Sequence, residues 1–438
     1  MFVHLPCPHR WRSRSPCPAL GRIVLAAVLS FGAVEAHAAA LTLDDALRLA
    51  QARSRQLPAQ DAAASAAREL AVAAGQRPDP TLRAGINNLP INGADRFSLT
   101  RDFMTMRSVG VMQEFTREGK LKARTARFER EAQVAEAGRE LALANLQRDT
   151  AMAWLDRHYQ ERMREVLIAQ RDEARLQIEA ADTAYRGGRG SQADVFAARS
   201  GVAQIEDRIA MTERQIAAAT TQLARWVGAA GDDALGAPPA LDAVQLRAED
   251  LATQLAHHPQ IAVMLNQEVL AQADADVARA NQTTDASVEL MLSQRGSAYS
   301  NMVSLNVSIP LQWDQKNRQD RELAAKLSTV EQMRAEREEA TRAHIAEATA
   351  MLQEWRSNRD RLTRYDGSLL PLASERTRAS IAAYRGGTGP LTAVLEARRG
   401  EIDTRMDRLR LEMDAARLWA QLNYLVPVGH GTTAAARP

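Results

Sequence analysis

The chain contains the stretch Ala184-Tyr185-Arg186-Gly187-Gly188-Arg189-Gly190, and 199 residues later it repeats this stretch as Ala383-Tyr384-Arg385-Gly386-Gly387-Thr388-Gly389. The similarity continues where residues 194–199 correspond to 393–398. A match of this length indicates an internal repeat, so the two halves of the chain are predicted to fold alike. Each half would then contain one glycine turn in the same structural position.

Stretches without proline flank each glycine turn. No proline occurs in 91–237, and 120–186 contains Gly138 as its only glycine. One helix of about 70 residues, roughly 100 Å long, is therefore predicted before the first turn. Glycine supplies the chain reversal at its end. In the second half, Gly367 and Pro371 predict a kink in the corresponding helix.

The helices that return from the two turns carry a heptad pattern. Apolar residues advance by alternating threes and fours, in the first half as Val202, Ile205, Ile209, Thr212, Ile216, Ala219, Leu223 and Trp226, and in the second as Ile402, Met406, Leu409, Met413, Ala416 and Ala420. This spacing is typical of a coiled-coil seam. Each long helix is predicted to pack against its return helix in a hairpin.

Short alternating stretches precede each long helix. The first half contains 82–86 and 109–115, and the second half contains 288–292 and 303–309, in which Val, Leu and Ile alternate strictly with Ser and Asn. This period of two predicts strands with one apolar and one polar face, either in a soluble sheet or in a membrane barrel with a wet lumen. Four strands cannot close a barrel, so in a membrane several chains would have to share one.

An alanine-rich helix opens the first half. Thr42 followed by Asp45 resembles a capping box, and Pro78 and Pro80 stop the helix, so we expect it over 42–76.

The first 38 residues resemble an export signal. Four arginines precede the apolar run 23–34, and Ala36-His37-Ala38 offers a small-x-small site, so cleavage is expected after Ala38. An uncleaved anchor helix is the alternative, but this run is shorter than the ~20 residues that span a bilayer. Cleavage would change the net charge from +2 to −1 and remove Cys7 and Cys17, which excludes disulfides and thiolate metal sites from the exported chain.

The predicted organisation is a signal peptide over 1–38, a first repeat over 39–228, a linker over 229–245, a second repeat over 246–427 and a tail over 428–438. With 45% hydrophobic and 25% charged residues, the sequence is typical of a folded protein, and its charge balance lacks the basic footprint of nucleic-acid binding. The sequence has no phosphate loop, nucleophile elbow or zinc-ligand spacing, so neither an enzyme nor a cofactor is predicted.

Several local patterns carry a family resemblance. They are Gly119-Lys120 after the second strand, Ile309-Pro310-Leu311 after the fourth, and Val394-Leu395-Glu396-Ala397 after the second glycine turn. Together with the tandem order of elements, they make residues 41–426 resemble the TolC-type outer-membrane efflux family. The resemblance implies a mainly α fold with a small membrane β-barrel portion, built as a homotrimer whose twelve strands form one barrel. Its helices would form a tunnel through the periplasm.

The resemblance also implies partners and site residues. The helical tips, which include Tyr185, Arg186, Gly187, Gly188, Tyr384, Arg385, Gly386 and Gly387, would dock onto a periplasmic adaptor and an inner-membrane efflux pump. Turn formation explains the glycines equally well. Glu396 falls where the family often places an acid near the periplasmic entrance, and Ala393 replaces a neighbouring acid, for which Asp194 offers compensation. Carboxylate rings favour cations in a pore, although both acids also suit a solvated helix surface.

The substrate is indicated by weaker patterns. Residues 78–80, 87–90 and 111–115 resemble the heavy-metal branch of this family more than the drug branch. Met104, Met106 and Met112 cluster near the second strand, and thioethers suit soft metals, although these side chains could equally fill a loop and a strand. His257-His258 before Pro259 reads as a helix terminus rather than a ligand pair.

The sequence therefore predicts the outer-membrane channel of a tripartite resistance-nodulation-division-type efflux system, with heavy-metal cations as substrate. A multidrug or type I secretion channel of the same family is the alternative. A periplasmic adaptor would normally have one hairpin flanked by β-rich domains, which this sequence lacks. A structural coiled-coil protein of the envelope would leave the alternating strands and the 199-residue repeat unexplained.

Overall fold

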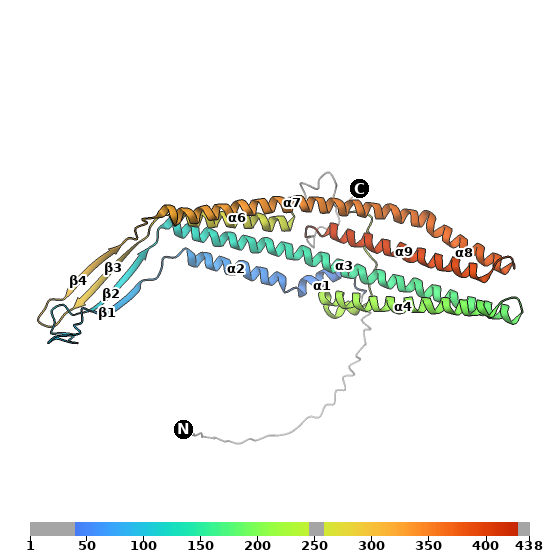
Figure 1. The fold of residues 1–438 in the computed structure, drawn as a ribbon, viewed down its shortest axis with the longest axis horizontal. Helices are drawn as coiled ribbons and strands as arrows, with labels where there is room; N and C mark the ends of the chain where they lie inside the picture. Colours follow the sequence, from blue (N-terminus) through green and yellow to red (C-terminus); the bar gives the residue numbers. More distant parts are fainter. Residues whose placement is uncertain (1–39, 245–257, 428–438) are drawn as a thin grey trace, which may run out of the picture. The chain divides into compact units, whose positions relative to one another are not determined.

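A computed structural model describes residues 40–244 and 258–427. The predicted signal peptide, the start of the second repeat at 246 and the tail from 428 lie outside the described residues. The described chain is mainly helical with one small antiparallel sheet, which confirms the predicted fold class at this level (Figure 1). Among the described residues, no helix is long and apolar enough to cross a membrane.

The elements follow the predicted order. The first half contains α1 (Leu43–Arg53), α2 (Gln56–Ala74), β1 (Thr81–Asn87), β2 (Met106–Phe115), α3 (Glu118–Arg186), α4 (Gln192–Val227) and a 3-10 turn (Gly228–Asp232). The second half contains α6 (Pro259–Ala280), β3 (Ala286–Gln294), β4 (Met302–Ser308), a 3-10 turn (Gln315–Asn317), α7 (Gln319–Arg364), a π turn (Tyr365–Leu369), α8 (Leu370–Arg385) and α9 (Leu391–Asn423). At 69 residues, α3 is the single long helix that the sequence predicts.

The first predicted helix is wrong in one respect, because it is interrupted. Ser54 separates α1 from α2 with an extended ψ of 132°. Pro58 explains the break, since a continuous helix would need its missing N–H and would push its ring against the carbonyl of Ser54. The predicted cap is present, with the Thr42 hydroxyl accepting from the Asp45 N–H at 3.1 Å.

The kink predicted in the second long helix takes the form of the π turn, which contains Gly367. Pro371 follows in the first turn of α8 and cannot donate a backbone hydrogen bond to the preceding turn. Asp366 in this turn accepts a hydrogen bond from the Arg408 guanidinium of α9 at 2.7 Å.

Four strands form one antiparallel sheet in the order β1-β2-β3-β4, with β1 and β4 at its edges. The register places on one face Leu82, Ala84, Ile86, Val109, Val111, Val288, Leu290, Leu292, Val303, Leu305 and Val307. Arg107, Gln113, Phe115, Ala286 and Gln294 lie on the same face toward the strand ends. The opposite face carries Thr81, Arg83, Asn87, Met106, Ser108, Met112, Glu114, Ser287, Glu289, Met291, Ser293, Met302, Ser304, Asn306 and Ser308. We call these the apolar face and the polar face.

The largest core cluster lies where α1, α3, α4, α7 and α9 meet. Trp154 of α3 is fully buried at its centre, and its indole N–H donates to the carbonyl of Leu41 at 3.0 Å. The predicted heptad positions of α9 are all buried, whereas Ile216, Ala219 and Trp226 of α4 are partly exposed. The apolar pattern therefore identifies the packed face of α9 fully and that of α4 in part.

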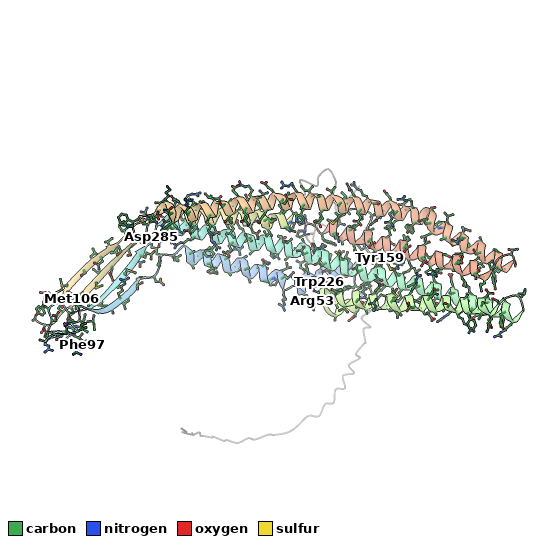
Figure 2. The ribbon with its side chains drawn as sticks, in the orientation of Figure 1. Arg53, Phe97, Met106, Tyr159, Trp226 and Asp285 are labelled. Atoms are coloured by element: carbon green, nitrogen blue, oxygen red, sulfur yellow. The ribbon has the colours of Figure 1, made fainter. Side chains whose placement is uncertain are left out.

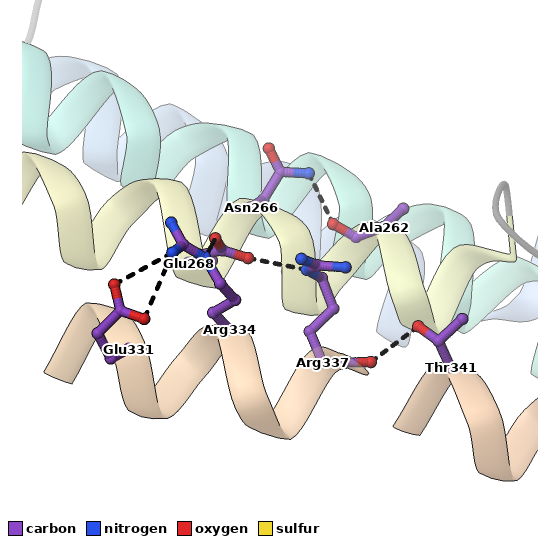
Figure 3. A network of polar contacts seen from close by, with 7 residues as sticks. All are labelled: Ala262, Asn266, Glu268, Glu331, Arg334, Arg337 and Thr341. Carbon is purple, nitrogen blue, oxygen red and sulfur yellow. Dashed lines mark hydrogen bonds and ion pairs between the residues drawn. The ribbon is translucent and has the colours of Figure 1, made fainter. Parts of the chain in front are cut away.

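An ionic network joins α6 to α7 (Figure 3). Glu268 of α6 accepts hydrogen bonds from Arg334 at 3.1 Å and from Arg337 at 2.8 Å, both on α7. The bond from Arg337, followed by the one from Arg334, lowers the pKa of Glu268 despite its burial. Glu268 therefore stays ionised and connects two helices that bury few large apolar side chains between them.

A second ionic contact joins the two halves where the strands meet the helices. Lys120 at the start of α3 pairs with Asp285, which precedes β3, at 2.6 Å. Figure 2 shows Asp285 at the junction of the sheet and the helices. The other Asp285 oxygen accepts from the backbone N–H of Arg117 at 2.9 Å. Burial raises the pKa of Asp285, but the hydrogen bonds from Lys120 and Arg117 outweigh it, so the pKa lies below its ordinary value.

Candidate functional site

The two glycine turns have the same backbone conformation. Gly188 and Gly387 have φ of +70° and +73°, in the left-handed region that glycine adopts without strain. The N–H groups of Arg189 and Thr388, five residues after Ala184 and Ala383, donate to the carbonyls of those residues, each at 2.9 Å. These bonds satisfy the carbonyls left free at the helix ends, so turn geometry accounts for the glycines at both tips.

The tyrosines and arginines of the two tips differ. Tyr384 packs partly buried against an apolar cluster of both hairpins, whereas Tyr185 is 46% exposed. Arg186 pairs with Asp182 at 2.8 Å. Arg385 is exposed and has no ion-pair partner among the described residues, because Ile381 occupies the position that corresponds to Asp182. Arg385 is thus the unpaired cation of the second tip.

The two acids predicted at the entrance have different surroundings. Asp194 forms a capping box with Ser191, accepting from its N–H at 2.9 Å and from its hydroxyl at 2.7 Å, and these bonds lower the pKa of Asp194. Glu396 is exposed on α9 and has no hydrogen-bond partner in the described chain. The structure therefore gives Asp194 a helix-capping role and leaves Glu396 as the free carboxylate.

A cavity of about 330 Å³ adjoins Glu396 between α3, α4 and α9. Three polar atoms of its lining are buried without a hydrogen-bond partner in the described chain, namely Gln170 Oε1, Gln177 Nε2 and Arg398 Nε. Ion pairs that join α9 to the first hairpin flank it, with Arg208 and Asp403 at 2.7 Å and Arg398 beside Glu173. These cross-hairpin pairs are absent from our sequence predictions, because a sequence shows charges on helix faces but not which helices meet.

The three predicted methionines are not brought together. Met106 and Met112 lie on the polar face of β2, six residues or roughly 20 Å apart, and Figure 2 shows Met106 beside Phe97 at the end of the sheet away from Asp285. Met104 is 46% exposed in the loop that precedes β2. Within residues 40–244 and 258–427, no group of three His, Cys, Asp or Glu side chains could hold a metal ion.

His258 confirms the prediction of a helix terminus, since it caps α6. Its Nδ1 accepts a hydrogen bond from the backbone N–H of Gln260 at 3.2 Å, and its ring stacks on His344 with a centroid separation of 5.0 Å. Burial, followed by the nearby His344 and Arg148, lowers the pKa of His258 to about 4. The neutral ring is therefore the form that both caps the helix and stacks on its partner.

We expect His258→Asn to reduce the pH dependence of stability. The depressed pKa means that the folded chain binds fewer protons than the unfolded chain, so wild-type stability falls as the pH drops from 6.5 to about 4. Asparagine supplies a capping oxygen that does not titrate. The apparent Tm, followed by circular dichroism at neutral pH and at about pH 4.5, should drop less in the variant. Equal drops in the two proteins would show that His258 does not contribute.

No protein-family model matches the sequence, and no curated protein matches it. Among solved structures, CusC, described for its transmembrane channel formation, is 16% identical, covers 88% of this chain and 92% of its own, and has a TM-score of 0.72. The outer membrane protein VceC from Vibrio cholerae is 17% identical over 87% of this chain and 95% of its own, with a TM-score of 0.71. The CmeC outer membrane channel of Campylobacter jejuni is 11% identical over 87% and 85%, with a TM-score of 0.73. The chain therefore shares its fold with these proteins, of which CusC is described for transmembrane channel formation and CmeC as an outer membrane channel.

Proposed function

We propose that this chain is the outer-membrane channel of a tripartite efflux system. The apolar face of the sheet is the observation that carries the proposal, because Leu82, Val303 and Leu305 are 72%, 70% and 68% exposed. Water-exposed apolar side chains of this extent in register over four strands are costly, whereas lipid would cover them. The polar face would then line a wet lumen.

The sheet edges support a trimer. Within the described chain, neither β1 nor β4 has a strand on its outer side, and unpaired backbone groups cannot face lipid. Three copies of a four-stranded sheet would supply twelve strands, enough to close a barrel. In this proposal the helices continue as a tunnel in the periplasm, and their glycine tips dock onto a periplasmic adaptor that links the channel to an inner-membrane pump.

We propose heavy-metal cations as the substrate, moved passively through the channel with energy supplied by the pump. A deletion strain, with and without the gene, would be grown on a panel of copper, silver, zinc, cobalt and cadmium salts beside several hydrophobic drugs. Sensitivity confined to one or two metals supports the proposal. Sensitivity to drugs alone would contradict heavy-metal cations as the substrate and indicate a multidrug channel instead.

The location of the protein is tested separately. An outer-membrane channel requires detergent for extraction and fractionates with outer membranes, whereas a periplasmic coiled-coil protein is released without detergent. Release in the soluble fraction would contradict the proposed channel whatever the outcome of the survival panel.

We expect Glu396→Gln to reduce cation selectivity in planar bilayers, because an unpaired carboxylate at a narrow entrance attracts cations. The reversal potential in a salt gradient reports this change. Asp407→Asn is the matched control, since Asp407 lies on the same helix but pairs with Arg410 at 3.0 Å. Unchanged selectivity in Glu396→Gln would show that Glu396 does not act on permeating cations at the entrance.

A further inference from the structure

The methionines of the sheet are segregated to one face. Every methionine within the four strands, namely Met106, Met112, Met291 and Met302, lies on the polar face, whereas Leu, Val, Ile and Ala predominate on the apolar face. Methionine and leucine have similar volumes and replace one another readily in packing. Packing alone therefore gives no reason for the thioethers to lie among Ser, Asn and Glu.

The register brings two of these thioethers to one carboxylate. Met112 lies directly opposite Glu289 on β3, and Met291 lies opposite Gly110, which makes it a diagonal neighbour of Met112. Diagonal partners on one face are about 7 Å apart at Cα, within reach of side chains as long as methionine. Gly110 contributes no side chain between them, and a Cβ there would lie 2.7 Å from the carbonyl oxygen of Leu290.

Arg83 shows that Met112 and Glu289 are close enough to contact the same group. Its guanidinium donates to Met112 Sδ at 3.2 Å and to Glu289 Oε1 at 3.4 Å. The side-chain amide of Asn306 donates a hydrogen bond to the other Glu289 oxygen, Oε2, at 3.3 Å. A positive group thus already lies between a thioether and a carboxylate, and since the Arg83 side chain is 52% exposed, it can leave that position at small cost.

There is room for an ion to approach. A depression of about 540 Å³ adjoins Met112 at the helix end of the strands. Glu114, Ser287 and Ser308 of the polar face line it, together with the ion pair of Lys120 and Asp285, in which the charge of Lys120 is balanced. A partly hydrated cation could reach Met112 from this side without passing the apolar face.

We propose that Met112, Met291 and Glu289 form a transit site for soft monovalent cations of the Ag⁺ and Cu⁺ class, with Arg83 as the resident cation that they displace. Two thioethers match the preference of a soft ion, and one carboxylate balances its single charge. Competition with Arg83 keeps the site weak, as transit requires. The inference rests on the proposed channel function and narrows its substrate to soft ions.

The test uses the full mature protein in planar bilayers with a nitrate electrolyte, and silver nitrate is the probe. We expect silver to reduce the single-channel current reversibly and zinc nitrate to leave it unchanged. In the double variant Met112→Leu/Met291→Leu, silver should no longer reduce the current below the level that the same variant shows before silver is added. Arg83→Gln should respond at a several-fold lower silver concentration, because the competing cation is gone. Met211→Leu, which alters an exposed methionine on α4, is the matched control and should behave as wild type.

The outcomes separate the two proposals. A protein that forms no pore contradicts the channel function itself. A normal pore whose silver response survives in the double leucine variant overturns the transit site and leaves the channel intact. Loss of the response in Met211→Leu as well would also overturn it, because silver would then act at exposed methionines in general.

Discussion

Lys120→Met will lower the apparent Tm of the purified protein by about 5 °C or more, because it leaves the Asp285 carboxylate buried without its partner. The two side chains are only 8% and 15% exposed, and their contact joins the first half of the chain to the second at the sheet boundary. Removing one member of a buried pair typically costs about 3–5 kcal/mol. Circular dichroism of the detergent-solubilised protein measures the change.

Lys122→Met is the matched control, since Lys122 pairs with Glu118 at 2.6 Å with both side chains more than 70% exposed. Pairs of this kind contribute less than about 1 kcal/mol, so the Tm of the control should barely move. The second variant Lys120→Met/Asp285→Asn should recover part of the loss, because it removes the unpaired charge. Equal Tm values for Lys120→Met and Lys122→Met would contradict a structural role for the Lys120 pair.

Local sequence patterns were sufficient for much of the fold. The absence of proline predicts α3 almost to the residue, and the repeated glycines predict both tips, because these features depend on backbone conformation within a few residues. The missing N–H and the bulky ring of Pro58 are local features too, and they would have predicted the break at Ser54. The two-residue period assigned the faces of the strands, since alternation is intrinsic to the pleat.

The candidate sites depend on contacts that no local pattern encodes. Met291 and Glu289 lie close to 180 residues from Met112, and only the sheet register brings them to it. The cross-hairpin pair of Arg208 with Asp403 likewise joins helices far apart in the sequence. The sequence repeat even misleads in one respect, because it makes Arg186 and Arg385 equivalent when their surroundings differ.

That difference leads to the second large effect. Arg385→Glu will lower resistance to the exported substrate by about tenfold or more, because it reverses the charge of an unpaired cation at the proposed adaptor contact. The variant should remain abundant in outer membranes as a trimer, since the Arg385 side chain is exposed and forms no ion pair with any described side chain. Survival on the metal or drug found by the growth panel gives the readout, beside cross-linking to measure the trimer.

Arg186→Glu is the matched control and separates docking from turn formation. Arg186 has the Asp182 carboxylate at 2.8 Å, which an approaching acidic partner would also meet, whereas no carboxylate of the described chain pairs with Arg385. Reversal of Arg186 should weaken resistance less than reversal of Arg385, although the two variants change corresponding positions of two turns with the same backbone conformation. If the two variants lose resistance equally, the tips act through a shared backbone geometry rather than through a specific cation. Full resistance in Arg385→Glu would show that the charge of Arg385 does not contribute to the proposed contact with the adaptor.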